Sequence, residues 1–254
     1  MTHDEGNSPV TRAVVLLSGG LDSAVVLALA RHVDHAECHC VSFDYGQRHR
    51  TELDAAAHIA SSLGAASHRV IRVDLRAIGG SALTADIAVP KDRPLAHHAN
   101  PGATPRADDI PITYVPARNL IFLSLASALA ETLDADRVYC GVNAVDYSGY
   151  PDCRPEFIAA FEKAATLATR AGAGGSRLSV HAPLATLSKA DIVRLGTRLG
   201  VDFGATHSCY DPAADGRACG HCDSCLIRRR AFVEAAIPDP TRYVESTTRH
   251  GAIA

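Results

Sequence analysis

The chain has 254 residues, a formal net charge of −3 and 47% hydrophobic residues. A chain of this length buries about 70–75% of its unfolded surface, so a stable core requires no disulfides. The net charge disfavours a protein that covers the phosphate backbone of a nucleic acid, and no apolar run is long enough to span a bilayer. We therefore expect a cytoplasmic protein, with one large domain or one domain and a small appendage, that binds neither nucleic acid nor membrane.

The first predicted element is an apolar strand, Ala13–Leu17, that leads into Ser-Gly-Gly-Leu-Asp-Ser at 18–23 and then into an apolar helix. Glycines let the backbone approach an anion, and the free N–H groups of a helix N-terminus face it. The lysine of a Walker-type loop is missing, and the string resembles the pyrophosphate loop of ATP pyrophosphatases. We predict ATP binding by Leu17, Ser18, Gly19, Gly20, Leu21, Asp22 and Ser23.

Apolar strands alternate with helical segments along the rest of the chain, which favours a parallel sheet covered by helices. The expected strands are Ala13–Leu17, Glu37–Phe43, His68–Val73, Arg137–Val142 and Leu178–Ala182. Helices are expected to begin near Asp22, Arg50, Asn119, Arg154 and Ser188. The predicted fold class is α/β, a Rossmann-like, doubly wound parallel sheet of five strands. The long segment Ala77–Pro116 interrupts the alternation and is expected to be a lid or a surface excursion.

Polar residues follow two of these elements at the edge where ligands bind in doubly wound sheets. After the second strand, Asp44 could hold Mg²⁺ or a ribose hydroxyl, and Arg48 could face phosphate. We predict that Asp44, Gln47 and Arg48 contact ATP. Arg118, which precedes the third helix, either meets phosphate or is solvated.

A second unusual stretch, residues 143–157, contains two tyrosines, acidic residues and an arginine framed by prolines. An aspartate can accept two N–H bonds from a guanine-like ring, a tyrosine can stack on that ring, and an arginine can hold a carboxylate. Cys153 has no evident partner for nucleophilic catalysis. The stretch therefore indicates recognition of a purine-like substrate.

Four of the eight cysteines, Cys209, Cys219, Cys222 and Cys225, have metal-ligand spacing. Four thiolates complete a closed structural Zn²⁺ site, although Cys-x-x-Cys-x-x-Cys also occurs in iron–sulfur proteins. We favour one structural zinc per chain. We accordingly expect an ATP-binding domain at 11–200 and a small zinc-binding helical segment at 201–254.

The residues at 228–230, which follow the cysteine cluster, are all arginine and indicate either a phosphate or RNA patch or the solvated face of a helix. The other four cysteines are expected to be buried.

Taken together, the glycine loop, residues 43–49, 115–119 and 141–157, and the four cysteines resemble the 7-cyano-7-deazaguanine synthase family. This family belongs to the ATP pyrophosphatase superfamily, whose fold resembles the adenine nucleotide alpha hydrolases. Gly-Tyr-Pro-Asp-Cys-Arg at 149–154, together with the cysteine cluster, is the specific part of the match.

The resemblance implies a ligase of queuosine or 7-deazapurine biosynthesis that converts 7-carboxy-7-deazaguanine and ammonia to a nitrile, using ATP and Mg²⁺. Adenylation of the acid, displacement by ammonia and adenylation of the resulting amide would be its steps. Ser18, Asp22, Ser23 and Arg118 are the catalytic candidates. The resemblance implies a homodimer, and substrate contacts by Tyr147, Tyr150, Asp152 and Arg154.

Two other functions stay open on the sequence. One is an adenylating enzyme that modifies tRNA, which should carry a basic RNA-binding domain that is not evident here. The other is a zinc-stabilised nucleotide sensor without catalysis, for which ATP would bind but release no pyrophosphate.

Overall fold

Five parallel strands form the centre of the fold in the computed structural model, which describes residues 11–47, 49–94, 110–143 and 149–244. The strands are β1 (Arg12–Leu16), β2 (Glu37–Asp44), β3 (Ser67–Arg72), β4 (Arg137–Tyr139) and β5 (Ser179–His181). Their order is β3-β2-β1-β4-β5, and every neighbouring pair is parallel. The predicted five-stranded, doubly wound sheet is therefore confirmed, and its strand order reverses between β1 and β4.

The five helices whose starts were predicted, α1, α2, α3, α4 and α6, begin within one residue of the predicted positions, and α5 and α7 are additional. They are α1 (Leu21–His32), α2 (Thr51–Ser62), α3 (Arg118–Thr132), α4 (Pro155–Ala168), α5 (Arg170–Ala173), α6 (Lys189–Arg198) and α7 (Asp223–Ala235). Two short 3₁₀ helices, η4 (Pro151–Cys153) and η5 (Phe203–Ala205), lie in the connections. Ser188 caps α6, because its hydroxyl accepts a hydrogen bond from the backbone N–H of Asp191 at 3.1 Å.

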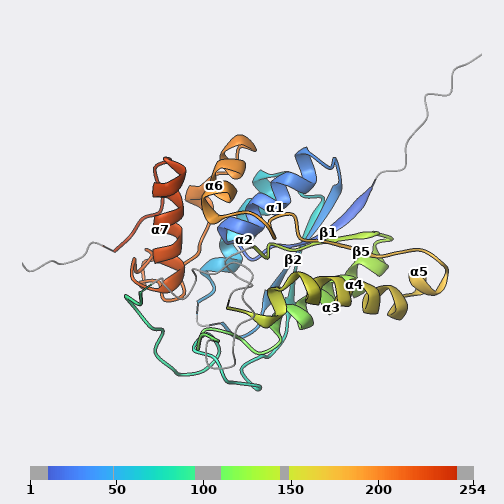
Figure 1. Ribbon diagram of the computed structural model, residues 1–254, viewed down its shortest axis with the longest axis horizontal. Helices are drawn as coiled ribbons and strands as arrows, with labels where there is room; N and C mark the ends of the chain where they lie inside the picture. The colour runs from blue at the N-terminus through green and yellow to red at the C-terminus, as the bar shows by residue number, and fades with distance from the viewer. Residues whose placement is uncertain (1–10, 48, 95–109, 144–148, 245–254) are drawn as a thin grey trace, which may run out of the picture.

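The two faces of the sheet are covered by different helices (Figure 1). Side chains alternate along β1, so Ala13 and Val15 pack with α1, α2, α6 and α7, whereas Val14 packs with α3 and α4. All three side chains are fully buried. Because both faces are covered, β1 is an uninterrupted apolar run rather than an alternating one.

The fourth strand is shorter than predicted, since β4 ends at Tyr139 and the prediction extended it to Val142. The backbone N–H of Cys140 still donates to His181 O at 2.9 Å, after which the chain turns toward the start of α1. A Cβ placed on Gly141 would lie 3.3 Å from the backbone nitrogen of Ser23. The close approach of the chain to α1 thus ends the strand beside the glycine loop.

Part of the predicted excursion lies against the C-terminal segment. Lys91 forms an isolated bridge with Cys222, and the backbone N–H of Asp92 donates to His221 O at 2.8 Å. Arg93 pairs with Asp223 at the start of α7. Residues 91–93 of the excursion therefore brace the segment that carries the four cysteines. No helix within the described ranges is long and apolar enough to cross a membrane.

Candidate active site and metal centre

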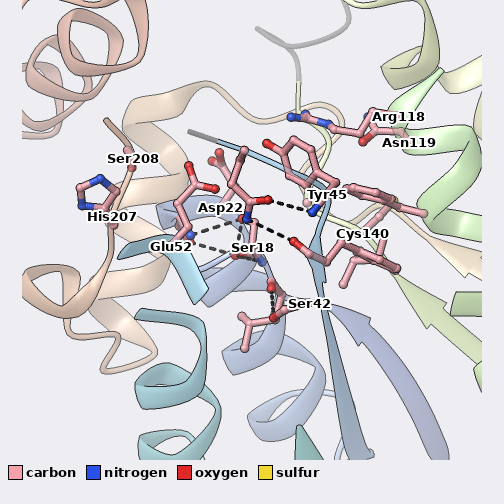
Figure 2. A pocket seen from close by; sticks show the side chains of 18 of the residues that line it. Ser18, Asp22, Ser42, Tyr45, Glu52, Arg118, Asn119, Cys140, His207 and Ser208 are labelled. Atoms are coloured by element: carbon pink, nitrogen blue, oxygen red, sulfur yellow. Dashed lines mark hydrogen bonds between the residues drawn. The ribbon is translucent and has the colours of Figure 1, made fainter. Parts of the chain in front are cut away.

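A cavity of about 260 Å³ opens at the carboxyl ends of β1, β2 and β4, where the strand order reverses. Its floor is the loop between β1 and α1, and its walls come from the segments after β2 and β4, the start of α3 and residues 207–210 (Figure 2). Ligands of doubly wound sheets bind at this position. The predicted phosphate loop therefore lies at the ligand-binding edge of the sheet.

The glycine loop is held in one conformation by its own hydrogen bonds. The Ser23 hydroxyl donates to Gly20 O at 3.0 Å and lies 3.1 Å from the Ser18 hydroxyl. Gly19 has φ +83°, and a Cβ on it would lie 2.2 Å from the backbone oxygen of Glu52. Only glycine combines this backbone angle with so close an approach. The loop thus presents the N-terminus of α1 to the cavity, a suitable arrangement for an anion.

Asp22 is paired with a residue that the sequence analysis missed. Lys189 Nζ lies 2.6 Å from Asp22 Oδ2, and the two side chains are 16% and 24% exposed. Asp22 Oδ1 is buried without a hydrogen-bond partner among the described residues. The only sequence signal for Lys189 was its position in the first turn of α6, since α6 reaches the loop only by packing on α1.

Of the predicted ATP contacts after β2, Gln47 lines the cavity and Asp44 does not. Gln47 lines the cavity and braces its own turn, because its side-chain oxygen accepts from the Tyr45 backbone N–H at 2.8 Å. Asp44 is not among the lining residues and instead lies 3.3 Å from Arg50. Arg48 lies outside the described residues. The geometry therefore brings Gln47, but not the carboxylate of Asp44, to the cavity.

Arg118 is the first residue of α3 and lines the cavity opposite the glycine loop. Burial raises the pKa of the Tyr45 hydroxyl nearby, although the positive charge of Arg118 opposes that effect. Burial also raises the pKa of Glu52 from 4.5 to about 7, again against the influence of Arg118. A half-buried cation that lines the cavity, such as Arg118, can neutralise phosphate charge.

Of the described residues in the predicted substrate-binding stretch, Tyr150 and Cys153 line the cavity, whereas Asp152 lines a small adjoining pocket that also contains Tyr150. The hydroxyl of Tyr150 lies 3.1 Å from the Thr113 hydroxyl, and its ring lies 6.0 Å from the Tyr114 ring. Asp152 is 7% exposed, and its Oδ2 accepts the Asn119 backbone N–H at 2.8 Å. Burial raises the pKa of Asp152, against the lowering effects of that hydrogen bond and of Arg118.

Of the other two predicted substrate residues, only Arg154 is among those that the structure describes. Arg154 precedes α4, is not among the cavity-lining residues and donates from Nε to Pro151 O at 3.0 Å. Tyr147 lies outside the described residues. Cys153 is buried and accepts a hydrogen bond from the Asn119 side chain at 3.0 Å.

Several cavity-lining residues were not predicted from the sequence, because they come from segments far apart in the chain. They are Ser42, Tyr45, Glu52, Phe122, Cys140, His207, Ser208 and Tyr210. The backbone N–H of His207 donates to Gly19 O at 2.8 Å, which ties the C-terminal segment to the glycine loop. Burial raises the pKa of the Cys140 thiol to about 12, so this cysteine is not a thiolate nucleophile at neutral pH.

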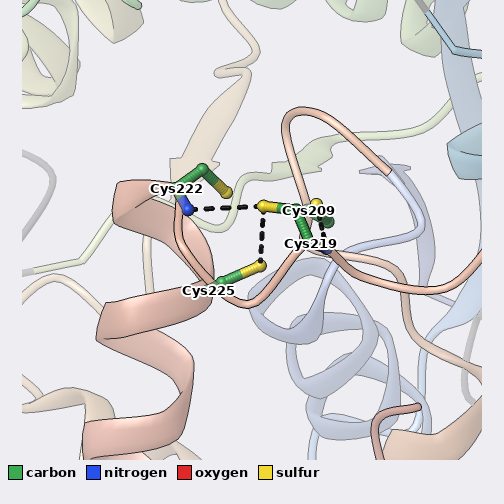
Figure 3. A group of neighbouring side chains, drawn as sticks. All are labelled: Cys209, Cys219, Cys222 and Cys225. Carbon is green, nitrogen blue, oxygen red and sulfur yellow. Dashed lines mark hydrogen bonds between the residues drawn. The ribbon is translucent and has the colours of Figure 1, made fainter. Parts of the chain in front are cut away.

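The four predicted metal ligands converge (Figure 3). Their sulfur atoms all lie within 4.8 Å of one another, and all four residues are buried. Backbone N–H groups of Asp211 and Cys219 point at the sulfur of Cys209, at 3.4 and 3.2 Å. Such donors stabilise thiolates, and four buried thiolates require a cation. Cys209, Cys219, Cys222 and Cys225 therefore form a cluster that could hold a metal ion.

The three consecutive arginines are not equivalent. Arg229 and Arg230 are exposed, as expected for a solvated helix face. Arg228 is only 4% exposed, so neither a surface patch nor a solvated face describes it. Its guanidinium donates to Asp239, Thr206 and the backbone oxygen of Phe203 at 2.7–3.1 Å. Both interpretations from the sequence were therefore wrong for Arg228, because α7 turns this side chain toward residues 203–208.

The family model described as "Queuosine biosynthesis protein QueC" matches residues 12–236. The chain belongs to the QueC family. The QueC match spans the glycine loop, the cavity walls and all four cysteines. The chain is also 58% identical over 237 residues to the 7-cyano-7-deazaguanine synthase of Myxococcus xanthus, covering 93% of this chain and 99% of that relative. It is 60% identical over 236 residues to the enzyme of the same name from Xanthomonas campestris pv. campestris, with 93% and 99% covered.

Among solved structures, an NMN synthetase from Francisella tularensis is similar at 16% identity and a TM-score of 0.46, covering 94% of this chain and 80% of that one. The QueC relatives, by contrast, match over nearly their entire length. The predicted family is therefore confirmed at the level of the sequence, and the metal site and the cavity described above are features of a QueC protein.

Proposed function

We propose that this chain is an ATP-dependent ligase that converts 7-carboxy-7-deazaguanine and ammonia to 7-cyano-7-deazaguanine in queuosine biosynthesis. The observation that carries the proposal is the close identity to relatives named for this activity, over almost the whole chain. The geometry supports it, because one cavity joins the glycine loop to a wall that carries aromatic residues, and Asp152 lines a small pocket beside that wall. Such a cavity suits a nucleotide and a flat polar ring side by side.

The reaction needs the carboxylate oxygen to become a leaving group. Attack of that oxygen on the α-phosphorus of ATP gives an acyl adenylate and releases pyrophosphate. Ammonia then displaces AMP and leaves an amide after loss of a proton. Adenylation of the amide oxygen, followed by loss of AMP and of the nitrogen-bound protons, gives the nitrile. The acid and the amide present an oxygen at the same position, so one cavity serves both rounds.

We assign roles to the residues on these grounds. Ser18, Gly19, Gly20 and Ser23 would hold the pyrophosphate, and Arg118 would neutralise charge across from them. Leu17 and Leu21 flank the loop, and Gln47 shapes the neighbouring turn. Tyr150 on the cavity wall and Asp152 in the adjoining pocket would recognise the ring, and Tyr147 and Arg154 are further candidates from the family resemblance. Asp44 and Arg48 remain candidate ATP contacts on the same basis.

Two metal ions belong to the proposal. Zn²⁺ fits the four cysteines, because four buried sulfurs close a tetrahedral site and the reaction transfers no electrons. Cys209, Cys219, Cys222 and Cys225 would hold it as a structural ion. Mg²⁺ would enter with ATP and offset the charge of the phosphates. Asp22 would complete the polar surface that faces them.

The assembly and the setting of the enzyme follow the family resemblance. We propose a homodimer in the cytoplasm that acts on a small molecule, with no nucleic acid or membrane as partner. Sedimentation velocity of the purified chain tests the dimer directly, and a single monomeric species at micromolar concentration would contradict it.

The experiment that tests the function is mass spectrometry of a reaction containing 7-carboxy-7-deazaguanine, ATP, Mg²⁺ and ammonium. We expect the nitrile as product, with the amide appearing transiently. Unchanged substrate in the presence of bound ATP would contradict the proposal, and bulk tRNA would then be tested as the acceptor. Adenylated tRNA or a modified base in that second assay would favour the tRNA-modifying alternative.

A further inference from the structure

We propose that Glu52 is the catalytic base that removes a proton from the attacking ammonia. The inference rests on the function proposed above and names a residue for its proton transfers. Glu52 lies in the first turn of α2 and lines the cavity. Figure 2 shows its side chain directed into the cavity between His207 and Asp22.

The position of Glu52 places it beside the reacting end of ATP. Its backbone oxygen lies against Gly19, so closely that no Cβ fits between them. The pyrophosphate that would occupy the glycine loop leaves from the α-phosphorus, to which the substrate becomes attached. A carboxylate directed into the cavity from this point is therefore next to the carbon that ammonia attacks.

The other carboxylates near the cavity are engaged, whereas Glu52 is not. Asp22 pairs with Lys189, and Asp152 accepts the backbone N–H of Asn119. Asp44 pairs with Arg50 outside the cavity. Among the residues that the structure describes, the Glu52 side chain has no hydrogen-bond or ion-pair partner, and the charge that acts on its pKa is that of Arg118. A carboxylate without a partner is free to exchange a proton with a ligand.

The proton affinity of Glu52 suits this role. Burial raises its pKa to about 7, against the opposing charge of Arg118, so that both protonation states are present near neutral pH. General bases work best when their pKa lies near the working pH. The titratable and charged residues that line the cavity with it are Asp22, Tyr45, His49, Arg118, Cys140, Tyr150, Cys153, His207, Cys209 and Tyr210.

The proton balance of the two rounds defines what Glu52 does. In the first, the nitrogen of ammonia forms a bond to the carbonyl carbon, the bond to the AMP oxygen breaks, and Glu52 takes one nitrogen-bound proton. In the second, the adenylated amide loses one nitrogen-bound proton to water, and Glu52 takes the other while the bond to the AMP oxygen breaks and the C≡N bond forms. The carboxylic acid returns each proton to water between rounds.

To test this role, adenylation and the attack of ammonia are measured separately in the Glu52→Gln variant. We expect substrate-dependent exchange of pyrophosphate into ATP, measured without ammonia, to stay within about threefold of wild type. Amide formation should fall by about 10²–10⁴-fold, the usual contribution of a general base. In wild type, the rate at a fixed concentration of free ammonia should rise with pH to a plateau with an inflection near 7, and the variant should lack this inflection.

Asp54→Asn is the matched control, because Asp54 is an exposed acidic residue in the same turn of α2 and does not line this cavity. It should leave both measurements unchanged. Glu52→Asp should fold like wild type and show an intermediate rate that keeps a pH inflection. This variant distinguishes proton transfer from a steric effect if the Gln variant is unstable.

Three results would overturn the role of Glu52. If Glu52→Gln lost pyrophosphate exchange and amide formation equally, Glu52 would act in ATP binding. If the variant needed more Mg²⁺ than wild type, Glu52 would be a metal ligand. If amide formation were unchanged, Glu52 would have no role in the reaction. If wild type forms neither amide nor nitrile, the proposed function fails and this inference fails with it. If wild type forms both and Glu52→Gln matches it, only the inference fails.

Discussion

At the scale of single residues, Gly19 shows how the loop depends on the absence of a side chain. Gly19→Ala must strain a backbone at φ +83° and must also push against the backbone of α2. We expect a loss of about 1–3 kcal/mol from the backbone strain alone, and loss of ATP binding in calorimetric titration. Gly200→Ala is the control, because Gly200 has φ +75° but open space around it. Normal ATP binding by the Gly19 variant would show that the loop is not the anion site.

The raised pKa of Glu52 makes the stability of the protein depend on pH. The pKa of Glu52 is raised in the folded state from 4.5 to about 7. The carboxyl group therefore makes its full contribution to the free energy of unfolding below pH 4.5, and this contribution is lost as the pH rises through 7. The loss has an upper limit of about 3 kcal/mol at about 1.4 kcal/mol per pKa unit. Glu52→Gln should therefore have a higher Tm than wild type at pH 8, and this difference should shrink at pH 5. Parallel Tm curves over that range would contradict the raised pKa.

At the scale of elements, Arg228 connects α7 to the segment that forms part of the active-site wall. It donates to Thr206 and to Phe203 O, and it pairs with Asp239, which is also nearly buried. Arg228→Met keeps most of the volume but leaves the Asp239 charge without its partner, a change that costs about 3–5 kcal/mol in buried pairs. Chemical denaturation should show this loss. The KM for ATP should also rise, because Thr206, to which Arg228 donates, directly precedes the cavity-lining residues His207 and Ser208.

Arg230→Met is the control on the same helix. Arg230 is exposed and pairs with Glu234 at i,i+4, where a salt bridge contributes about 0.3–0.5 kcal/mol. We expect its stability and its KM to match wild type within error. If the two variants behave alike, Arg228 does not position the wall of the cavity.

The elements themselves were largely predictable, whereas their boundaries depended on packing. Apolar runs such as Ala13–Leu17 indicated strands because both faces of a parallel sheet are buried. The end of β4 was misplaced, because the turn at Gly141 is dictated by α1, which is distant in sequence. For the same reason, residues 77–94 gave no signal that they would lie against the metal site.

At the scale of the whole molecule, the metal centre and the cavity share a boundary. Cys209 is one of the four ligands and lines the cavity with Tyr210. Structural zinc supplies apparent folding energies of about 10–16 kcal/mol in small domains. Removal of the metal by a chelator should therefore lower the Tm and also raise the KM for ATP, and added Zn²⁺ should restore both. Elemental analysis should give one zinc per chain.

Cys222→Ser and Cys38→Ala form the matched pair for this prediction. Both cysteines are fully buried, but only Cys222 belongs to the cluster. The first variant should lose the metal, and the second should retain it with only the small cost of a cavity. Iron and sulfide in place of zinc in the wild-type protein would contradict the assignment of the ion while leaving the four ligands in place.

The sequence by itself determined the fold class, the glycine loop, the four metal ligands and the family, because each depends on residues that are close together in the chain or on a regular apolar pattern. The tertiary structure decided which side chains meet. Lys189, Glu52 and His207 reach the glycine loop from three elements, and Arg228 is buried although its two neighbours are exposed. These contacts depend on how α2, α6 and α7 pack, and no short pattern in the sequence records that packing.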